Sequence, residues 1–170
     1  MFTLFSKIHL GIRQFYIPLK NEWKTEVLLN LYKMMEISQA MIYCNSKKTL
    51  DKLSEDMVRN GFSVSTMHGE MQEQDRERVM RDFRTGMTRV LISVDLIARG
   101  KDVYQVNLVI NYDMPKVENY IQRVGRSGRF GRKGAAINFI TPEDDNVLDQ
   151  IQNFYQTKIT ELPTDLSKIN

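Results

Sequence analysis

Residues 40–67 read A-M-I-Y-C-N-S-K-K-T-L-D-K-L-S-E-D-M-V-R-N-G-F-S-V-S-T-M. The apolar run that ends at Cys44 predicts a buried strand over residues 39–44. Ser46 is a favoured type for a helix N-cap, and Asn60-Gly61 ends the helix that follows. The side chains expected on the buried face of this helix are Leu50, Leu53, Met57 and Val58. Residues 62–67 alternate as a second strand, so the stretch makes one strand–helix–strand unit.

The same alternation continues on both sides of this unit. Toward the N-terminus, residues 13–17 predict a strand closed by Pro18, and Asn21 is expected to cap a helix over residues 22–36. The apolar residues of that helix fall at helical spacing: Trp23, Val27, Leu28, Leu31 and Met35. Toward the C-terminus, the expected strands are 89–94, 106–111 and 135–140, and the expected helices are 71–85, 115–125 and 142–157. Of the helix over 71–85, the inward side chains are Val79, Met80 and Phe83.

Repeated alternation of helices with continuous apolar strands is typical of a parallel sheet covered on both faces. The sequence therefore predicts an α/β fold, a three-layer α/β/α sandwich with a mainly parallel sheet. A chain of 170 residues that is 42% hydrophobic and 26% charged has the composition of one soluble globular domain. No segment approaches the roughly 20 apolar residues of a membrane span, and the N-terminus does not resemble a signal peptide.

The single cysteine and the two histidines narrow the chemistry further. Cys44 excludes an internal disulfide and is typical of a core residue in an intracellular protein. His9 and His68 lie far apart and lack the spacing of metal ligands, so no metal site is predicted. These features favour a protein of the cytoplasm or nucleus.

Positive charge concentrates in residues 120–134, Y-I-Q-R-V-G-R-S-G-R-F-G-R-K-G, called the basic loop below. Its glycines recur every third residue and allow backbone N–H groups to approach an anion. Arginine adds a planar fork of donors that matches phosphate oxygens. The basic loop is therefore predicted to bind a polyphosphate, with a solvated basic surface as the alternative.

Polar residues follow several predicted strands: Asn45, His68 and Gly69, Asp95 to Asp102, and Asp113. Ligands of parallel α/β sheets bind outside the carboxyl ends of the strands. We therefore expect these residues to share one edge of the domain with the basic loop.

Four motifs occur in order: A-M-I-Y-C-N-S-K-K at 40–48, S-T-M-H-G-E-M at 65–71, S-V-D-L-I-A-R-G-K-D-V at 93–103 and Q-R-V-G-R-S-G-R-F-G-R-K-G at 122–134. Their order and spacing closely resemble the second RecA-like lobe of DEAD-box RNA helicases. G-I-R-Q-F-Y at 11–16 and V-I-N-Y-D-M-P at 109–115 resemble the translation initiation factor 4A subfamily. The resemblance implies a helicase C-terminal domain over residues 13–170, preceded by a remnant of an interdomain linker over residues 1–12.

For ATP, the resemblance implies that Arg126 and Arg129 are arginine fingers that stabilise the γ-phosphate during hydrolysis. Such arginines are worth roughly 10³ to 10⁵ in rate, because they neutralise charge on the transferred phosphoryl group. Asp102 is implied to contact the ribose, and Gln122 occupies a nucleotide-binding position where the family normally has His. Arg123 is expected to be structural and to bind the last carbonyls of its own helix.

For RNA, the implied backbone contacts are Asn45, Gly69, Arg76, Arg99 and Gly100. Such groups bind phosphates without reading bases, which suits sequence-independent binding. Taken singly, Asn45 and Gly69 are also explained as turn residues and Arg76 as a solvated helix residue. Val94 replaces the family's Thr and Glu73 replaces its Gln, and both changes are expected to weaken RNA binding.

The sequence contains no G-x-x-x-x-G-K-[ST] phosphate loop and no Asp-Glu-Ala-Asp run. ATP and its Mg²⁺ are therefore expected to be held mainly by a first helicase lobe that these residues do not include. The chain is predicted to be inactive alone, monomeric and not membrane-bound. RNA, the first lobe and a scaffold initiation factor are the implied partners.

Three alternatives remain at this stage. The lobe can be a non-catalytic module that docks RNA or protein, which the missing first lobe and the three departures at Gln122, Val94 and Glu73 favour. G-R-K-G at 131–134 can be the clamp loop of a KH domain, although KH domains are much shorter than this chain. A relative that acts on DNA is the third alternative.

Overall fold

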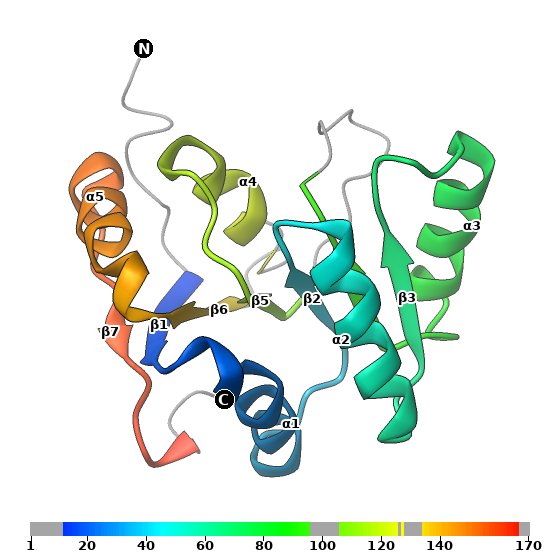
Figure 1. Ribbon diagram of the computed structural model, residues 1–170, viewed down its shortest axis with the longest axis horizontal. Helices are drawn as coiled ribbons and strands as arrows, with labels where there is room; N and C mark the ends of the chain where they lie inside the picture. Colours follow the sequence, from blue (N-terminus) through cyan, green and yellow to red (C-terminus); the bar gives the residue numbers. More distant parts are fainter. Residues whose placement is uncertain (1–11, 96–105, 126, 128–133, 167–170) are drawn as a thin grey trace.

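The centre of the molecule is a seven-stranded sheet in which all paired strands are parallel (Figure 1). The computed structural model describes residues 12–95, 106–125, 127 and 134–166. The strands are β1 (Ile12–Pro18), β2 (Ala40–Tyr43), β3 (Val64–Met67), β4 (Val90–Ser93), β5 (Leu108–Asn111), β6 (Gly134–Ile140) and β7 (Thr160–Glu161). Their spatial order is β3-β4-β2-β5-β6-β1-β7. The predicted α/β fold with a parallel sheet is confirmed.

Five α-helices cover the two faces of this sheet: α1 (Lys24–Met34), α2 (Lys47–Arg59), α3 (Glu73–Arg84), α4 (Tyr120–Val124) and α5 (Asp145–Tyr155). Buried residues of α1 and α2 pack on one face of the sheet, in a cluster that includes Leu28, Leu53 and Ile42. On the other face, α3 packs over the β2–β4 side of the sheet and α4 and α5 pack over the β6 side. The arrangement is the three-layer sandwich expected from the sequence.

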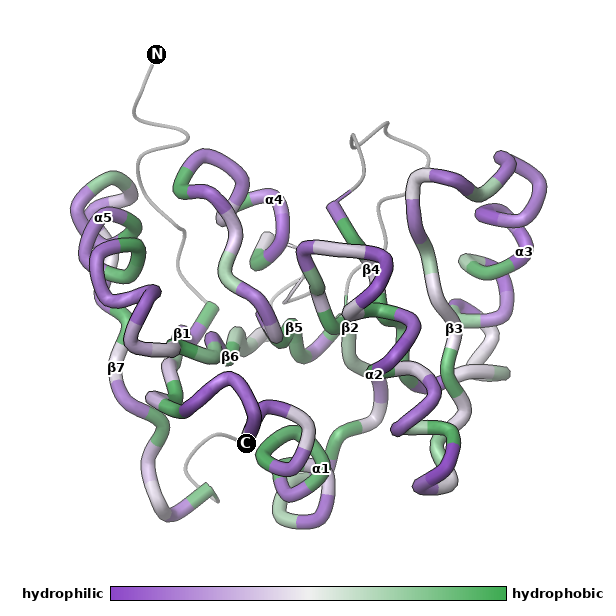
Figure 2. Tube along the Cα trace, viewed as in Figure 1, coloured by the Kyte–Doolittle hydropathy of each residue, from purple (hydrophilic) through white to green (hydrophobic). Residues whose placement is uncertain are grey.

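The central strands are buried from both faces, which explains their continuous apolar sequences. All four residues of β2, β4 and β5 are buried, and Figure 2 shows these strands as mostly hydrophobic segments between more polar helices. Alternate residues of β2 serve the two faces: Ile42 joins the cluster of α1 and α2, whereas Met41 and Tyr43 join that of α3. Within the described residues, no helix is long and apolar enough to cross a bilayer.

The start of α1 differs from the prediction. Asn21 does not cap the helix but begins a 3-10 turn, η1 (Asn21–Trp23), and no side-chain capping bond is made there. Trp23, predicted to face the core, is 48% exposed, and the Lys20 ammonium lies 5.1 Å from the centroid of its ring. Lys24 is buried instead, because its ammonium pairs with the Asp113 carboxylate. The 3-10 turn rotates the first residues relative to the helical spacing used in the prediction.

The predicted cap of α2 is confirmed, since the Ser46 hydroxyl oxygen accepts a hydrogen bond from the Thr49 N–H. Leu50, Leu53 and Met57 are buried as expected, but Val58 is 55% exposed and its predicted place in the core is wrong. The helices predicted to begin at Pro115 and Pro142 open instead with 3-10 turns, η3 (Val117–Asn119) and η4 (Pro142–Asp144).

Candidate functional site

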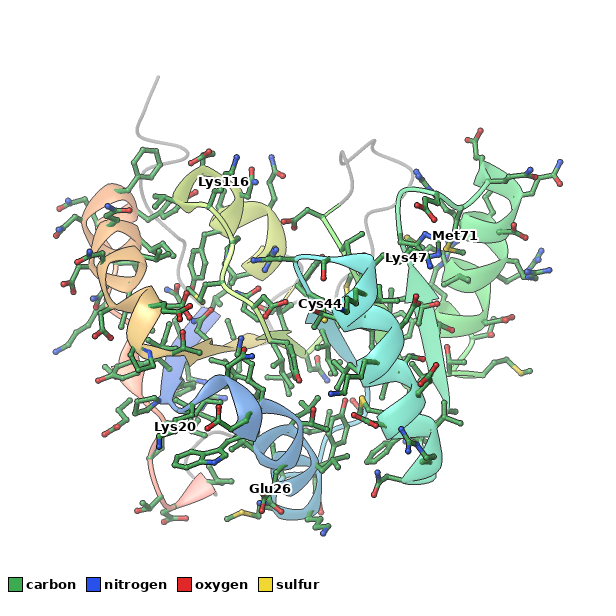
Figure 3. The ribbon with its side chains drawn as sticks, viewed as in Figure 1. Lys20, Glu26, Cys44, Lys47, Met71 and Lys116 are labelled. Atoms are coloured by element: carbon green, nitrogen blue, oxygen red, sulfur yellow. The ribbon has the colours of Figure 1, made fainter. Side chains whose placement is uncertain are left out.

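Polar residues follow the strands β2, β3, β4 and β5 at one edge of the sheet, called the carboxyl edge below. Because the strands are parallel, their carboxyl ends meet there. Asn45 follows β2, His68 and Gly69 follow β3, Asp95 follows β4, and Asp113 follows β5. Figure 3 shows Lys47, Met71 and Lys116 on segments that leave this edge. The sequence-based prediction of one shared polar edge is confirmed for these residues.

Arg123 on α4 connects the groups at the carboxyl edge. Its side chain is only 1% exposed. The guanidinium holds the Asp95 carboxylate with a two-pronged contact, Nε to Oδ1 at 2.7 Å and Nη2 to Oδ2 at 2.6 Å. This fork geometry is available to Arg and not to Lys. The contact fixes the end of β4 against α4.

The remaining donors of Arg123 reach the ends of β2 and β5. Nη2 donates to the Asn45 Oδ1 at 2.7 Å, and Nη1 donates to the Asp113 carbonyl at 2.6 Å and to the Asn111 Oδ1 at 3.2 Å. The guanidinium carbon also lies 5.2 Å from the centroid of the Tyr43 ring. Every N–H of the guanidinium therefore has an acceptor. Arg123 is structural as predicted, but its predicted partners, the carbonyls of its own helix, are wrong.

Asp113 extends this set of contacts to α1 and to the turn after β2. One carboxylate oxygen accepts from the Lys24 ammonium at 2.9 Å, and the other accepts from the Asn45 N–H at 2.9 Å. The Asn45 Nδ2 donates to the Met114 carbonyl at 2.9 Å. Lys24 and Arg123 thus balance Asp113 and Asp95, so this part of the edge is close to neutral and internally bonded. We call these four charged residues with Asn45 the Arg123 cluster.

α4 forms the first residues of the basic loop, and two described residues follow it, Gly125 and Ser127. Gly125 ends α4, and a Cβ there would lie 2.7 Å from the Ile121 carbonyl oxygen, so glycine permits the close approach. Ser127 is buried, with its hydroxyl donating to the Val124 carbonyl and its backbone bridging Val106. Gln122 is exposed on α4.

Five predicted site residues lie outside the described residues: Arg99, Gly100, Asp102, Arg126 and Arg129. Arg99, Gly100 and Asp102 belong to the segment that follows Asp95. Arg126 and Arg129 come after Gly125, on either side of Ser127. The structure thus brings the starting points of these segments together at the Arg123 cluster.

Gly69 and Arg76 lie together at the outer end of the carboxyl edge, beyond β3. The Arg76 Nη2 donates to the Gly69 carbonyl at 3.2 Å. The Arg76 Nε and the His68 Nδ1 are buried and have no hydrogen-bond partner among the described residues. Unpaired buried donors are costly unless a ligand or water completes them. An anion beside Arg76 fits this arrangement.

Two of the three departures from the family pattern, Glu73 and Val94, flank this end of the edge. Glu73 is exposed in the first turn of α3. Val94 is half-buried, and its N–H donates to the Met67 carbonyl at 3.1 Å. The Val94 side chain packs against the core cluster that α1 and α2 share, whereas the Glu73 side chain is exposed to solvent.

Sequence reasoning missed several residues that build this site. Lys24 was overlooked because a lysine in an amphipathic helix is normally solvated. Asn111 and Asn138 are fully buried inside β5 and β6 and carry hydrogen bonds to Arg123 and to each other. A signal was present for them, since an Asn inside an otherwise apolar central strand demands a buried partner.

Within the described residues, no group of His, Cys, Asp and Glu side chains is arranged to hold a metal ion. Burial raises the pKa of the Cys44 thiol to about 12, and the Asp113 carboxylate adds to the rise. The thiol is therefore neutral and unsuited to act as a nucleophile at neutral pH.

Comparisons with known proteins connect this edge to a family. A model described as the helicase conserved C-terminal domain matches residues 23–131. The chain is 52% identical over 161 residues to "Eukaryotic initiation factor 4A" of Caenorhabditis elegans, covering 94% of this chain and 40% of that protein. It is 53% identical over 161 residues to "ATP-dependent RNA helicase FAL1" of Meyerozyma guilliermondii, covering 94% and 41%. The chain thus spans about two fifths of the length of these curated relatives.

Solved structures agree with this similarity. The C-terminal domain of the DEAD-box protein Dbp5 superposes with a TM-score of 0.84 at 39% identity, covering 94% of this chain and 96% of that one. Saccharomyces cerevisiae Dbp5 bound to RNA and ADP BeF3 superposes with a TM-score of 0.84 at 37% identity, covering 96% of this chain and 45% of that one.

Proposed function

The chain belongs to the family of helicase conserved C-terminal domains, among DEAD-box relatives named initiation factor 4A and FAL1, and on this premise we propose that it is the second lobe of an ATP-dependent RNA helicase. In this proposal residues 13–170 form the lobe and residues 1–12 belong to a linker from the first lobe. The lobe supplies arginine fingers and RNA-backbone contacts for local, ATP-driven RNA unwinding. The relatives named initiation factor 4A support a role in translation initiation and a cytoplasmic location.

The observation that carries the proposal is the Arg123 cluster. It ties Asn45, a proposed RNA contact, to the helix that leads into Arg126 and Arg129. It also holds Asp95, from which the chain runs to Arg99, Gly100 and Asp102. A lobe that must respond to RNA and ATP together needs these two sets of residues in fixed relation. The contacts of one buried arginine with the described ends of their segments support this proposal.

On the ATP side, Arg126 and Arg129 neutralise charge on the transferred phosphoryl group, and Asp102 and Gln122 contact the nucleotide. ATP with Mg²⁺ supplies the phosphoryl group and its counter-charge when bound. The first lobe is the proposed holder of both, because the phosphate loop and the metal carboxylates of the family are not in this sequence. The described part of the site supports this role, since α4 is capped by Gly125, and Ser127 beyond it is tied to Val124 and Val106.

On the RNA side, the proposed contacts are Asn45, Gly69, Arg76, Arg99 and Gly100. The unpaired Arg76 Nε supports an anion at the β3 end of the carboxyl edge. At the other end, the Asn45 side chain already bonds Arg123 and Met114, so RNA has access only to its remaining amide hydrogen and lone pair. Backbone contacts of this kind are independent of base sequence. A scaffold initiation factor is a further proposed partner, and the lobe itself is proposed to be monomeric.

The decisive experiment joins the chain to the first lobe of the C. elegans relative and measures RNA-stimulated ATP hydrolysis by this two-lobe chimera. Arg126→Ala and Arg129→Ala are each expected to lower kcat at least about 100-fold. Arg59→Ala is the matched control, since Arg59 is the last residue of α2 and, within the described ranges, its ion-pair partner is the neighbouring Asp56 on the surface. Asp102→Ala should raise the KM for ATP more than it lowers kcat, because a ribose contact contributes mainly to uniform binding. Near-normal turnover in both arginine variants would reduce the basic loop to a solvated surface.

A non-catalytic docking module is the second candidate, favoured by Val94 and Glu73. If these side chains face RNA, Val94→Thr restores a donor worth on the order of 1 kcal/mol and Glu73→Gln removes a like charge of similar effect. We expect the double variant of the chimera, with a non-hydrolysable ATP analogue, to bind single-stranded RNA roughly tenfold more tightly. The Glu73→Gln part should shrink at high salt because salt screens it. Fluorescence anisotropy at two salt concentrations measures this, and unchanged affinity at both would favour the docking module.

A further inference from the structure

One row of residues crosses the sheet, and its members on β5 and β6 form hydrogen bonds with α4. Strand register aligns Ser93, Tyr43, Asn111, Asn138 and Tyr16 on β4, β2, β5, β6 and β1. For β2, β4 and β5 this is the last row before the carboxyl edge. Two amides in the middle of such a row are unusual for a central parallel sheet, because both are fully buried.

These amides belong to a continuous chain of hydrogen bonds that begins at Arg123. The Asn111 Oδ1 accepts from Arg123, and the Asn111 Nδ2 donates to the Asn138 Oδ1 at 2.7 Å. The Asn138 Nδ2 donates to the Tyr120 hydroxyl at 3.1 Å, which in turn donates to the Gln14 Oε1 at 2.8 Å. Gln14 then donates to the Thr157 hydroxyl at 2.8 Å. We call Gln14, Asn111, Tyr120 and Asn138 the buried amide chain.

The buried amide chain forms hydrogen bonds with α4 at Tyr120 and Arg123, on the same face of the helix. Tyr120 and Arg123 are three residues apart and therefore neighbours on one side of the helix. The helix has five residues, which is too short to be stable by itself, so its position is set by its tertiary contacts. An apolar row would pack α4 with similar stability but without directional bonds. The hydrogen bonds fix both the rotation of α4 and its height above the sheet.

We propose that the buried amide chain is a set of positioning residues for the part of the basic loop that follows α4, residues 125–134. It holds α4 so that the two arginines that follow Gly125 meet the γ-phosphate in the correct geometry. The proposal rests on the proposed helicase function and assigns new roles to residues that touch neither ATP nor RNA. Small displacements of a catalytic group can cost a large factor in rate, because phosphoryl transfer depends on alignment.

The test removes the Tyr120 hydroxyl from the buried amide chain. In the two-lobe chimera, Tyr120→Phe keeps the ring in its pocket but breaks the links to Asn138 and Gln14. We expect kcat for RNA-stimulated ATP hydrolysis to fall about tenfold, with KM for ATP and RNA affinity within about twofold of the parent. Tyr112→Phe is the matched control, because among the described residues its part-buried hydroxyl bonds Thr25, on the opposite face of the sheet. That variant should keep the parent kcat.

A double-mutant cycle separates a connected chain from independent packing effects. Asn138→Leu should lower kcat to a similar degree. Adding Tyr120→Phe to it should lower kcat little further, because the buried amide chain is already interrupted.

Hydrogen exchange gives a readout that does not depend on ATP. The Gly125 and Ser127 amides, bonded to the Ile121 and Val124 carbonyls, should exchange at least about fivefold faster in Tyr120→Phe but not in Tyr112→Phe.

The outcomes are distinguishable from failure of the proposed function. If Arg126→Ala and Arg129→Ala leave turnover intact, the helicase assignment itself is wrong. If they abolish turnover while Tyr120→Phe retains the parent kcat and exchange rates, or if the two network substitutions are simply additive, the positioning role is overturned. Should Tyr120→Phe lower the folded fraction at the assay temperature, Gln14→Met decides the same question, since it removes the acceptor of that hydroxyl at similar volume.

Discussion

Arg123 is a residue whose identity should matter more than its charge. All of its N–H groups have acceptors at the ends of three strands, and Lys offers fewer donors without the planar fork. We expect Arg123→Lys to lower the free energy of unfolding by about 3 kcal/mol, because Asp95 and Asn45 lose charged hydrogen bonds. Urea denaturation measures the loss. Arg59→Lys is the control, where an exposed pair with Asp56 should change stability by less than about 0.5 kcal/mol.

Cys44 gives the molecule a predictable response to alkaline pH. Burial raises the pKa of its thiol from an ordinary 9.0 to about 12, the Asp113 carboxylate adds to the rise, and Arg123 and Lys24 oppose it. Above about pH 9 the unfolded chain releases this proton while the folded chain keeps it. The stabilisation is therefore complete below pH 9 and is lost as pH rises toward 12.

The pH effect is isolated by comparing the parent with Cys44→Ala in urea at pH 8 and about pH 10.5. Buried tyrosines titrate in both proteins and cancel. Between these pH values the parent should lose on the order of 2 kcal/mol more than the variant. Equal losses in the two proteins would show that the thiol titrates normally in the folded state.

The helix α2 provides a prediction at the level of one element. Ser46→Ala removes the oxygen that accepts from the Thr49 N–H at the start of α2. The expected loss is about 1 kcal/mol of unfolding free energy, measured by thermal or urea denaturation. Ser54→Ala, in the middle of the same helix, serves as the control and should be close to neutral. A cap loss no larger than the control would mean that solvent satisfies the end of the helix equally well.

Elements were predicted well where one local signal dominates. The apolar runs located six strands, and the Ser46 cap with Asn60-Gly61 located α2 to within a residue. Helix starts near Asn21, Pro115 and Pro142 were misplaced, because each begins with a 3-10 turn whose spacing differs from that of an α-helix. β7 was not foreseen, since two exposed residues carry no periodicity.

The site was predictable as an edge but not as a bonded cluster. Parallel strands place Asn45, Asp95 and Asp113 at the same end of the sheet, so their proximity follows from topology alone. Which of these residues accept hydrogen bonds from Arg123 depends on the rotation of α4 and on how deeply Asn111 is buried. Packing between segments far apart in the sequence sets both. Spacing in sequence carries no information on these distances.

For the whole molecule, we expect a purified chain of these 170 residues to hydrolyse no ATP, because the phosphate loop and metal carboxylates of the family are not in its sequence. The two-lobe chimera, assayed with the same RNA and Mg²⁺, is the positive control. A phosphate-release assay should give the chain the rate of buffer alone. Turnover that persists after further purification, and that disappears in Arg126→Ala, would show that the lobe is catalytic by itself.

The place of β1 in the sheet has a consequence for how the protein is made. β1 lies between β6 and β7, pairing Ile12 with Gly134 and Phe15 with Thr160, so the strand synthesised early has both of its neighbours in the last third of the chain. On a ribosome that adds roughly 5 to 20 residues per second, the β2–β4 half can assemble seconds before β1 finds a partner. During that interval β1 is an unpaired edge, the kind of segment that chaperones shield from aggregation.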